Sequence, residues 1–225
     1  MNNYNAGVSC RHKEDNSYMT NTELSKNYWR YYLMLEKRLI EINDIVEIHS
    51  KNYKSFSNGF AMLLQSIGAE LDNFFKLYCG SNLADRKSIT DYANTILNQD
   101  SAIVSQKVDV LNTNLSIIPF ENWNTLKPAK SLGWWQAYDN IKHNRVGNIE
   151  DANLENTLRA LSGLYLLEMK AYKKYANLDS SGSPTEPDLP PEESRLFAIE
   201  NWNNRYVPLN RAFAIIDGAV HMSTT

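Results

Sequence analysis

Apolar residues recur every three or four positions over the first long stretch of the chain, from about Thr20 to Tyr53. This spacing places them on one stripe of a helix, for which Thr20 or Thr22 is a suitable N-cap. A second apolar strip beside the first indicates contacts on two sides, as expected of the central helix of a bundle. The first strip contains Tyr28, Tyr32, Leu35, Leu39, Ile42, Val46 and Tyr53, and the second contains Trp29, Leu33 and Ile40.

A second long helical pattern follows the turn SFSNG at 55–59 and ends at Gly80. Ser57 or Asn58 can cap its start, and a glycine is a common stop at a helix C-terminus. Two long helices joined by a short turn form an antiparallel hairpin. The apolar positions of this second helix are Phe60, Leu63, Leu64, Ile67, Leu71, Phe74, Phe75 and Tyr78.

After a shorter helical pattern at 88–97, the period changes to alternation of apolar and polar residues between 104 and 110. The polar turn at 112–114 then leads into LSIIPF. A two-residue period with β-branched residues predicts a small β-hairpin inserted into a helical protein. Pro119 restricts its second half to an edge position.

Two further helices complete the predicted bundle. One begins near Pro128 or Ser131 and carries the stretch WWQAYDNIKHNR at 134–145, and the other runs from about Glu150 or Asn153 to Tyr175. The predicted fold class is therefore all-α, an antiparallel bundle of about five helices with a small β-hairpin insertion. The apolar stripe of the last helix contains Leu154, Leu158, Leu161, Tyr165, Met169 and Tyr172.

Polar and proline-rich segments delimit this helical domain, which we expect to span 21–178. Residues 1–20 lack periodicity and are predicted to be disordered. Residues 179–194 are rich in Pro, Ser and Glu, so we predict a flexible linker. Apolar and aromatic residues return in the tail 195–225, which must dock on its own domain or on a partner. A chain of 225 residues suits one domain with such an appended tail.

Composition and charge narrow the classes of function. The chain is 43% hydrophobic and 22% charged, as in ordinary soluble globular proteins. Its net charge of −3 argues against broad attraction to nucleic acid, although it allows a local basic patch. The two cysteines, Cys10 and Cys79, form no cluster, so we expect no metal or cofactor and a reducing cytoplasm. The absence of a signal peptide and of a run of about 20 apolar residues predicts no membrane association.

Common catalytic motifs do not occur in the sequence. Without a Gly-rich phosphate loop, a GxSxG elbow or an HExxH helix, the chain lacks the signatures of P-loop hydrolysis, serine hydrolysis and zinc proteolysis. Among the four histidines, only His143 has reactive neighbours. His49 is expected to end the first helix in line with its apolar stripe, and His12 and His221 lie in the predicted tails.

The stretch 134–145 separates apolar and polar residues onto opposite faces of its helix. Asp139 precedes His143 by four residues, so its carboxylate can hydrogen-bond the imidazole and favour the charged form. Lys142 and Arg145 flank the histidine near the helix C-terminus, where the helix dipole also favours cations for purely structural reasons. The apolar face contains Trp134, Ala137, Tyr138 and Ile141, and the polar face contains Gln136, Asp139, Asn140 and His143.

Acidic residues on the other long helices give weaker signals. Asp72 and Lys76 have the four-residue spacing of a solvated ion pair. Glu70 borders the apolar stripe of its helix and is a candidate supporting residue for the site. Glu168 lies near the stripe of the last helix, where the pattern favours an exposed edge over a buried position beside a cation.

The order of these elements resembles that of the HEPN superfamily, which contains many ribonuclease toxins of bacterial toxin–antitoxin, abortive-infection and antiviral systems. The family signature is an arginine, usually followed by a polar residue, with a histidine four to six residues beyond the arginine. The stretch YDNIKH at 138–143 looks like this signature, with Asp139 as the polar residue and His143 as the histidine. Tyr138 stands at the arginine position, and Lys142 or Arg145 are candidate substitutes. The resemblance covers about residues 22–177.

The resemblance implies metal-independent cleavage of RNA in bacterial antiphage defence or in a toxin–antitoxin system. His143 would act as acid and base at a ribose 2′-hydroxyl, Asp139 would orient it, and Arg145 would stabilise charge on the phosphate. HEPN domains commonly form homodimers in which two motifs line one cleft, so a homodimer is expected. The residues implied to bind RNA are Lys142, Asn144 and Arg145, and those in supporting roles are Tyr138 and Glu70.

Two other interpretations remain open. The tyrosine at position 138 favours a catalytically inactive HEPN-like module that binds a protein or nucleic-acid partner in a defence complex, with 195–225 as a docking segment. The third interpretation is a helical scaffold in which 134–145 supplies only core residues and C-terminal charges. A dimer with His143 of both copies in one groove would favour the nuclease, whereas an isolated, solvent-facing His143 would favour the alternatives.

Overall fold

The computed structural model describes residues 20–82, 84–175, 189–200 and 202, together with the backbone of two strands at 211–216 and 219–224. The predicted disordered N-terminus before Thr20 and most of the predicted linker lie outside these residues. The described chain is mostly helical and contains a small three-stranded antiparallel sheet. The predicted helical architecture is therefore confirmed, but the chain is not all-α.

The first helical segment is shorter than predicted. It comprises α1 (Asn21–Leu24), a π-helical turn η1 (Ser25–Trp29) and α2 (Arg30–Asn43). Thr20 caps it through a capping box with Glu23. The predicted extension to Tyr53 was wrong, because the side chain of Asn43 accepts a hydrogen bond from the N–H of Ile48 at 2.7 Å and closes a loop.

His49 is not part of an apolar helical stripe, contrary to the prediction. It is the N-cap of the short 3-10 helix η2 (Ser50–Asn52), and its Nδ1 accepts a hydrogen bond from the N–H of Lys51 at 3.1 Å. A histidine that caps a turn in this way has a structural role.

The remaining long helices lie close to their predicted positions. The long α3 (Asn58–Tyr78) is capped by Ser57 and followed by Gly80, whose φ of 69° is the left-handed conformation of a helix stop. The others are α4 (Ile89–Gln99), η3 (Ser101–Ser105), α5 (Pro128–Ser131), α6 (Gly133–Asn144), η4 (Ile149–Asp151) and α7 (Leu154–Tyr175). The short 3-10 helices η3 and η4 were not predicted.

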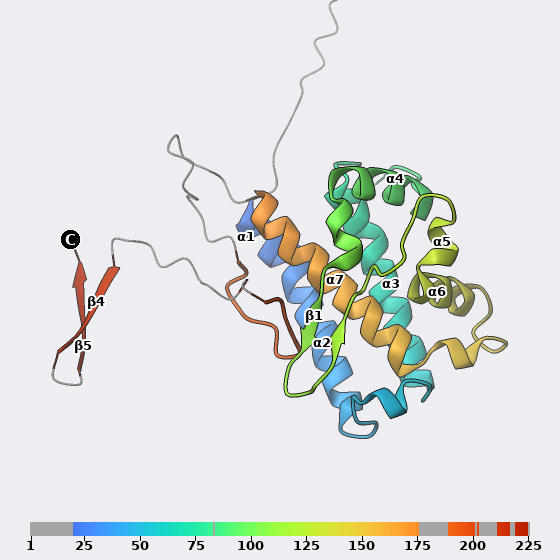
Figure 1. The fold of residues 1–225 in the computed structure, drawn as a ribbon, viewed down its shortest axis with the longest axis horizontal. Coiled ribbons are helices and arrows are strands. Elements are labelled where there is room, and N and C mark those ends of the chain that lie inside the picture. Colours follow the sequence, from blue (N-terminus) through green and yellow to red (C-terminus); the bar gives the residue numbers. More distant parts are fainter. Residues whose placement is uncertain are drawn as a thin grey trace, which may run out of the picture.

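The central helix of the bundle is α7, not the first helix. It contacts α1, α2, α3 and α6, and Figure 1 shows it between the α1–α2 segment and the pair α3 and α6. Its residues are buried on nearly all sides from Leu158 to Tyr172, as expected of a helix without a solvent face.

The predicted β-hairpin is present and gains a third strand. β1 (Val108–Val110) pairs with β2 (Ser116–Ile117) and, on its other edge, with β3 (Phe197–Ala198) of the C-terminal tail. The strand starts at Val108 and not near 104, because residues 101–105 form η3, in which the Ser105 hydroxyl donates to the carbonyl of Ala102. The beginning of the tail therefore docks on its own domain.

The residues just before β3 also lie against the helices. The indole N–H of Trp29 donates to the carbonyl of Glu192 at 2.8 Å, and Pro190 is buried. The last part of the predicted linker, 189–194, is thus packed in this structure. Further along the tail, β4 (Arg211–Ile216) and β5 (Ala219–Thr224) form an antiparallel hairpin of their own.

No helix within the described residues has the length and apolar composition needed to cross a membrane.

Candidate functional site

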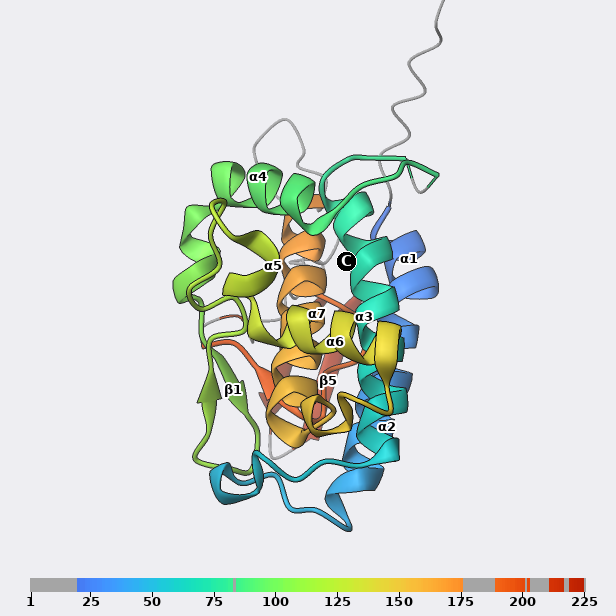
Figure 2. The same cartoon turned by 90° about the vertical axis from the view of Figure 1, so that its right-hand side faces the viewer.

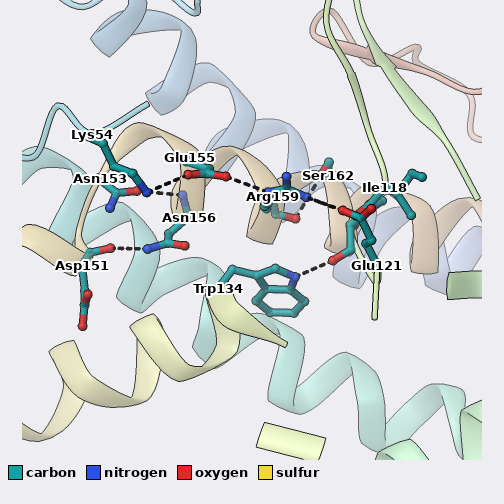
Figure 3. A network of polar contacts seen from close by, with 11 residues as sticks. Lys54, Ile118, Glu121, Trp134, Asp151, Asn153, Glu155, Asn156, Arg159 and Ser162 are labelled. Atoms are coloured by element: carbon teal, nitrogen blue, oxygen red, sulfur yellow. Dashed lines mark hydrogen bonds and ion pairs between the residues drawn. The ribbon is translucent and has the colours of Figure 1, made fainter. Parts of the chain in front are cut away.

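The stretch singled out in the sequence is α6, which lies across α3 and α7 (Figure 2). Its apolar face is buried as predicted, with Trp134 and Ile141 only 2% and 1% exposed. The indole N–H of Trp134 donates to the carbonyl of Pro119 at 2.7 Å, which ties the start of α6 to the segment after β2 (Figure 3). A tryptophan with its polar atom satisfied in this way is a rigid anchor for the helix.

Tyr138 is a packing residue between α6 and α3. Its ring lies directly over Gly68, where an added Cβ would be 2.2 Å from Cδ2 of the tyrosine. Burial raises the pKa of Tyr138 and outweighs the opposing effect of Lys142. A phenol is either neutral or negatively charged, so Tyr138 supplies no positive charge to the site.

This contact leads to a stability prediction. Gly68→Ala should lower the free energy of unfolding by about 1 to 3 kcal/mol, because the new methyl group must displace the ring of Tyr138 or move α6. Gly59→Ala is a matched control in α3, since its added Cβ would meet neighbours at 3.5 Å and 3.6 Å, which is ordinary contact. Chemical denaturation measures both effects, and an equal change in the two variants would contradict the prediction.

The polar residues of the candidate site meet at the exposed end of α6. His143 Nε2 lies 3.3 Å from Asp139 Oδ1, and the two side chains are 73% and 48% exposed. In the neutral imidazole, Nε2 would carry the hydrogen and donate it in a hydrogen bond to the carboxylate. Nδ1 is then the basic nitrogen. The pair can therefore accept and release a proton at a surface position.

The two cationic candidates both point towards neighbouring side chains. Lys142 Nζ lies 5.6 Å from the centre of the Tyr138 ring, a cation–π distance. Arg145 Nη1 donates to Asn58 Oδ1 at 2.6 Å, which joins the end of α6 to the start of α3. Arg145 still has several other N–H donors, so this one bond does not exhaust its capacity to bind an anion.

Asn144, which the family resemblance implies to contact RNA, takes part in the turn that follows α6. Its Oδ1 accepts a hydrogen bond from the N–H of Gly147 at 3.1 Å. Asn148 donates to the carbonyls of Asn140 and Asn144 at 3.1 Å and 2.9 Å. These bonds satisfy carbonyls that the end of a helix leaves open, and they fix the turn that carries His143.

A chain of amides behind the candidate site was missed in the sequence. Gln136 donates to Asn140 Oδ1 at 3.0 Å, and Asn140 donates to Asp151 Oδ2 at 2.7 Å, which links α6 to η4. The four-residue spacing of the two amides was visible in the sequence. The partner Asp151 was not, because it comes from another element.

A neighbouring charged network at the start of α7 is structural (Figure 3). Glu155 accepts from Lys54 at 3.0 Å and from Arg159 at 3.3 Å, and Arg159 also reaches the carbonyl of Ile118 at 3.4 Å. The network connects the loop before α3, helix α7 and the end of β2. It holds together the framework on which α6 packs.

Glu70 was expected to support the candidate site, but its described interactions are with Asn73, Glu168 and Tyr28, which do not belong to that site. Burial raises its pKa while Asn73 opposes the shift through a hydrogen bond, and its charge acts on Glu168 and Tyr28. Asp72, one turn after Gly68 in α3, is the acid of this helix whose charge raises the pKa of Tyr138. It pairs with Lys76 at 3.1 Å, but Lys76 is only 14% exposed, so the pair is not fully solvated.

Glu168 is buried, contrary to the predicted exposed edge. Its exposure is 0%, and neither carboxyl oxygen has a hydrogen-bond partner among the described residues. Burial, and then the nearby carboxylate of Glu70, raise its pKa well above the ordinary value. The core of the bundle therefore favours the neutral form of this carboxyl group.

Comparison of the chain with protein-family models, with curated proteins and with solved structures gave no match. Within the described residues, no group of three or more His, Cys, Asp and Glu side chains is arranged to hold a metal ion.

Proposed function

We propose that the exposed end of α6 is a HEPN-type site for metal-independent cleavage of RNA. The observation that carries this proposal is the His143–Asp139 pair, 3.3 Å apart and open to solvent, with Lys142 and Arg145 on the same helical turn or the next. A proton acceptor beside cationic groups is what transesterification at a ribose 2′-hydroxyl requires.

The roles follow from the chemistry of each side chain. His143 removes the proton from the 2′-hydroxyl, and the oxygen then attacks the adjacent phosphorus to form a 2′,3′-cyclic phosphate. The bond from phosphorus to the 5′-oxygen of the next nucleotide breaks, and the imidazolium of His143 returns the proton to this leaving oxygen. Asp139 stabilises the imidazolium that forms. Arg145 binds the phosphate oxygens as negative charge develops, in place of the arginine that Tyr138 replaces.

A second copy of the chain would supply the walls that one copy lacks around His143. The imidazole is 73% exposed, and catalysis of this kind gains strength when water is excluded. Apolar side chains border the polar cluster: Val146 is 78% exposed, and Met62, one turn after the Asn58 that binds Arg145, is 71% exposed. Exposed apolar side chains next to the polar cluster support a homodimeric arrangement in which a second copy covers them.

The test is cleavage of a mixed-sequence RNA by the purified full-length protein in the presence of a metal chelator. His143→Ala should reduce the rate at least about a hundredfold, since a general acid–base group contributes about 10² to 10⁴. His49→Ala is the matched control, because His49 only caps η2, and it should retain the wild-type rate. Equal activity of wild type and His143→Ala, or no activity of either, would reject the nuclease.

A second candidate function is an inactive module that binds RNA or a protein partner within a defence complex. Two observations favour it. Tyr138 is buried against Gly68, so the site lacks the cation of the family signature, and the imidazole of His143 is 73% exposed to solvent. This alternative predicts that RNA binding is weakened by Arg145→Ala and Lys142→Ala while no cleavage product appears. A filter-binding measurement on the same RNA distinguishes it from the nuclease.

A further inference from the structure

An open cavity lies where three separate segments meet: the end of α2 with the loop after it, the turn between β1 and β2, and the residues just before β3. Its volume is about 270 Å³, just below the ~300 to 1,000 Å³ of sites for drug-sized ligands. The apolar part of its lining consists of Ile40, Ile48, Leu111 and Leu196. The cavity is therefore suited to a small molecule that carries an apolar group.

Two opposite charges belong to the lining of this cavity. The carboxylate of Glu47 comes from the loop after α2, and the guanidinium of Arg195 comes from the C-terminal segment. Both residues are exposed, and neither charged group forms an ion pair or a hydrogen bond with the described residues. Each group is therefore open to a ligand. A ligand with only one charge would be attracted by one of them and repelled by the other.

Hydrogen bonds fix the backbone that carries each charge. The N–H of Ile48, the residue after Glu47, donates to Asn43 Oδ1 at 2.7 Å. The N–H of Arg195 donates to the buried carboxylate of Glu36 at 3.0 Å. Because these bonds already order the backbone, binding of a ligand costs little further backbone entropy.

An uncharged donor also belongs to the lining. Asn43 uses its Oδ1 for the bond from Ile48, whereas its side-chain NH₂ group has no hydrogen-bond partner among the described residues. An amide N–H of this kind can bind a carboxylate oxygen together with a guanidinium.

We propose that this cavity binds a free aliphatic α-amino acid such as leucine, with its carboxylate on Arg195 and its ammonium group on Glu47. A guanidinium binds a carboxylate through two parallel N–H groups, and the Glu47 carboxylate accepts N–H bonds from the ammonium. An amino acid has no net charge, so neither wall repels it. A peptide carries these two groups at opposite ends, and only the free amino acid presents both to one cavity.

The apolar residues of the lining determine the preference for an aliphatic side chain. Ile40 and Leu111 are half-buried and can therefore still lose water-exposed surface when a ligand packs on them. This inference is independent of the nuclease proposal, because it uses none of the residues of α6.

The test is an NMR titration of the full-length protein with L-leucine, followed through the backbone N–H signals of Ile48 and Leu111. We expect saturable shifts by ~10 mM leucine, a tenfold excess over a dissociation constant of about 1 mM. Two analogues each lack one charge: 4-methylpentanoate has no ammonium group, and 3-methylbutylamine has no carboxylate. Each should bind at least about tenfold more weakly than leucine. The absence of saturation with leucine, or equal affinity for either analogue, would overturn the proposal.

Variants assign the two ends of the ligand. Glu47→Gln and Arg195→Gln should each weaken leucine binding at least about tenfold, because each removes one charged hydrogen-bond partner. Glu47→Gln should not weaken binding of 4-methylpentanoate, and Arg195→Gln should not weaken binding of 3-methylbutylamine.

Asp44→Asn is the matched control for these variants, since Asp44 is exposed in the same loop as Glu47 but does not line the cavity. It should retain the wild-type affinity for leucine. Thermal unfolding checks that every variant is folded, as expected for changes at exposed side chains. An equal loss of affinity in Asp44→Asn, or unchanged affinity in both Glu47→Gln and Arg195→Gln, would reject the site.

Discussion

Glu36→Ala should lower the free energy of unfolding by about 2 to 4 kcal/mol and release the segment 189–202 from the domain. The Glu36 carboxylate accepts hydrogen bonds from the hydroxyl of Tyr32 at 2.7 Å, from the N–H of Arg195 at 3.0 Å and from the N–H of Leu196 at 3.1 Å, and also from the hydroxyl of Ser194. Each buried donor that loses its acceptor costs about 1 to 3 kcal/mol. Undocking of the segment limits the total by returning its N–H groups to water.

Two measurements check this expectation. Chemical denaturation gives the loss of stability, and limited proteolysis reports whether cleavage between Leu189 and Trp202 becomes faster. Glu41→Ala is the matched control on the same helix, since Glu41 is 45% exposed and forms only surface ion pairs with Lys37 and Arg38. It should change stability by less than about 0.5 kcal/mol. If both variants behaved alike, the carboxylate would not be the anchor of the tail.

Glu168→Gln should stabilise the protein at neutral pH. Because burial and Glu70 raise the folded-state pKa of Glu168 well above 4.5, the stability that the neutral carboxyl contributes is fully present below the unfolded-state pKa. It is lost as the pH rises through the folded-state pKa. Between pH 4 and pH 7 the wild type should therefore lose up to about 3 kcal/mol relative to the variant, which has no proton to release.

The matched control is Glu155→Gln on the same helix, for which the opposite pH dependence is expected. Burial raises the pKa of Glu155, but the hydrogen bonds and charges of Lys54 and Arg159 outweigh it and leave the pKa lowered. Its contribution to stability is therefore present above the unfolded-state pKa and lost as the pH falls. Urea unfolding from pH 4 to pH 8 compares the variants. A pH-independent difference between wild type and Glu168→Gln would contradict the assignment of a neutral, buried Glu168.

The elements that were predictable depended on signals close together in the sequence. Helix α3 has a serine cap at Ser57, a continuous apolar stripe and a glycine stop at Gly80, and all three are confirmed. The end of the first helix was predicted wrongly, because the side chain of Asn43 competes for the backbone of Ile48. The apolar pattern continued past this point, since Val46 and Tyr53 pack against the core from loops.

In the candidate site, too, contacts within one helix could be predicted from the sequence, and contacts between helices could not. The contact between Asp139 and His143 could be predicted, because four residues of one helix fix the geometry. The contact of Arg145 with Asn58 joins two helices, and its partner could not be identified from α6 alone. Glu168 was predicted at an exposed edge because its own helix shows only one strong stripe, but α7 is enclosed by neighbours on nearly all sides.

The sequence by itself determined the helical class, the start and end of α3, the place of the small β-hairpin and the separation of apolar and polar faces in α6. These features arise from periodicity, caps and turns, which act within a few residues. Only the tertiary structure decided that α7 is the centre, that the tail completes the sheet, and that Tyr138 packs on Gly68. Those outcomes depend on which surfaces meet, and burial is a property of the assembled helices rather than of any one of them.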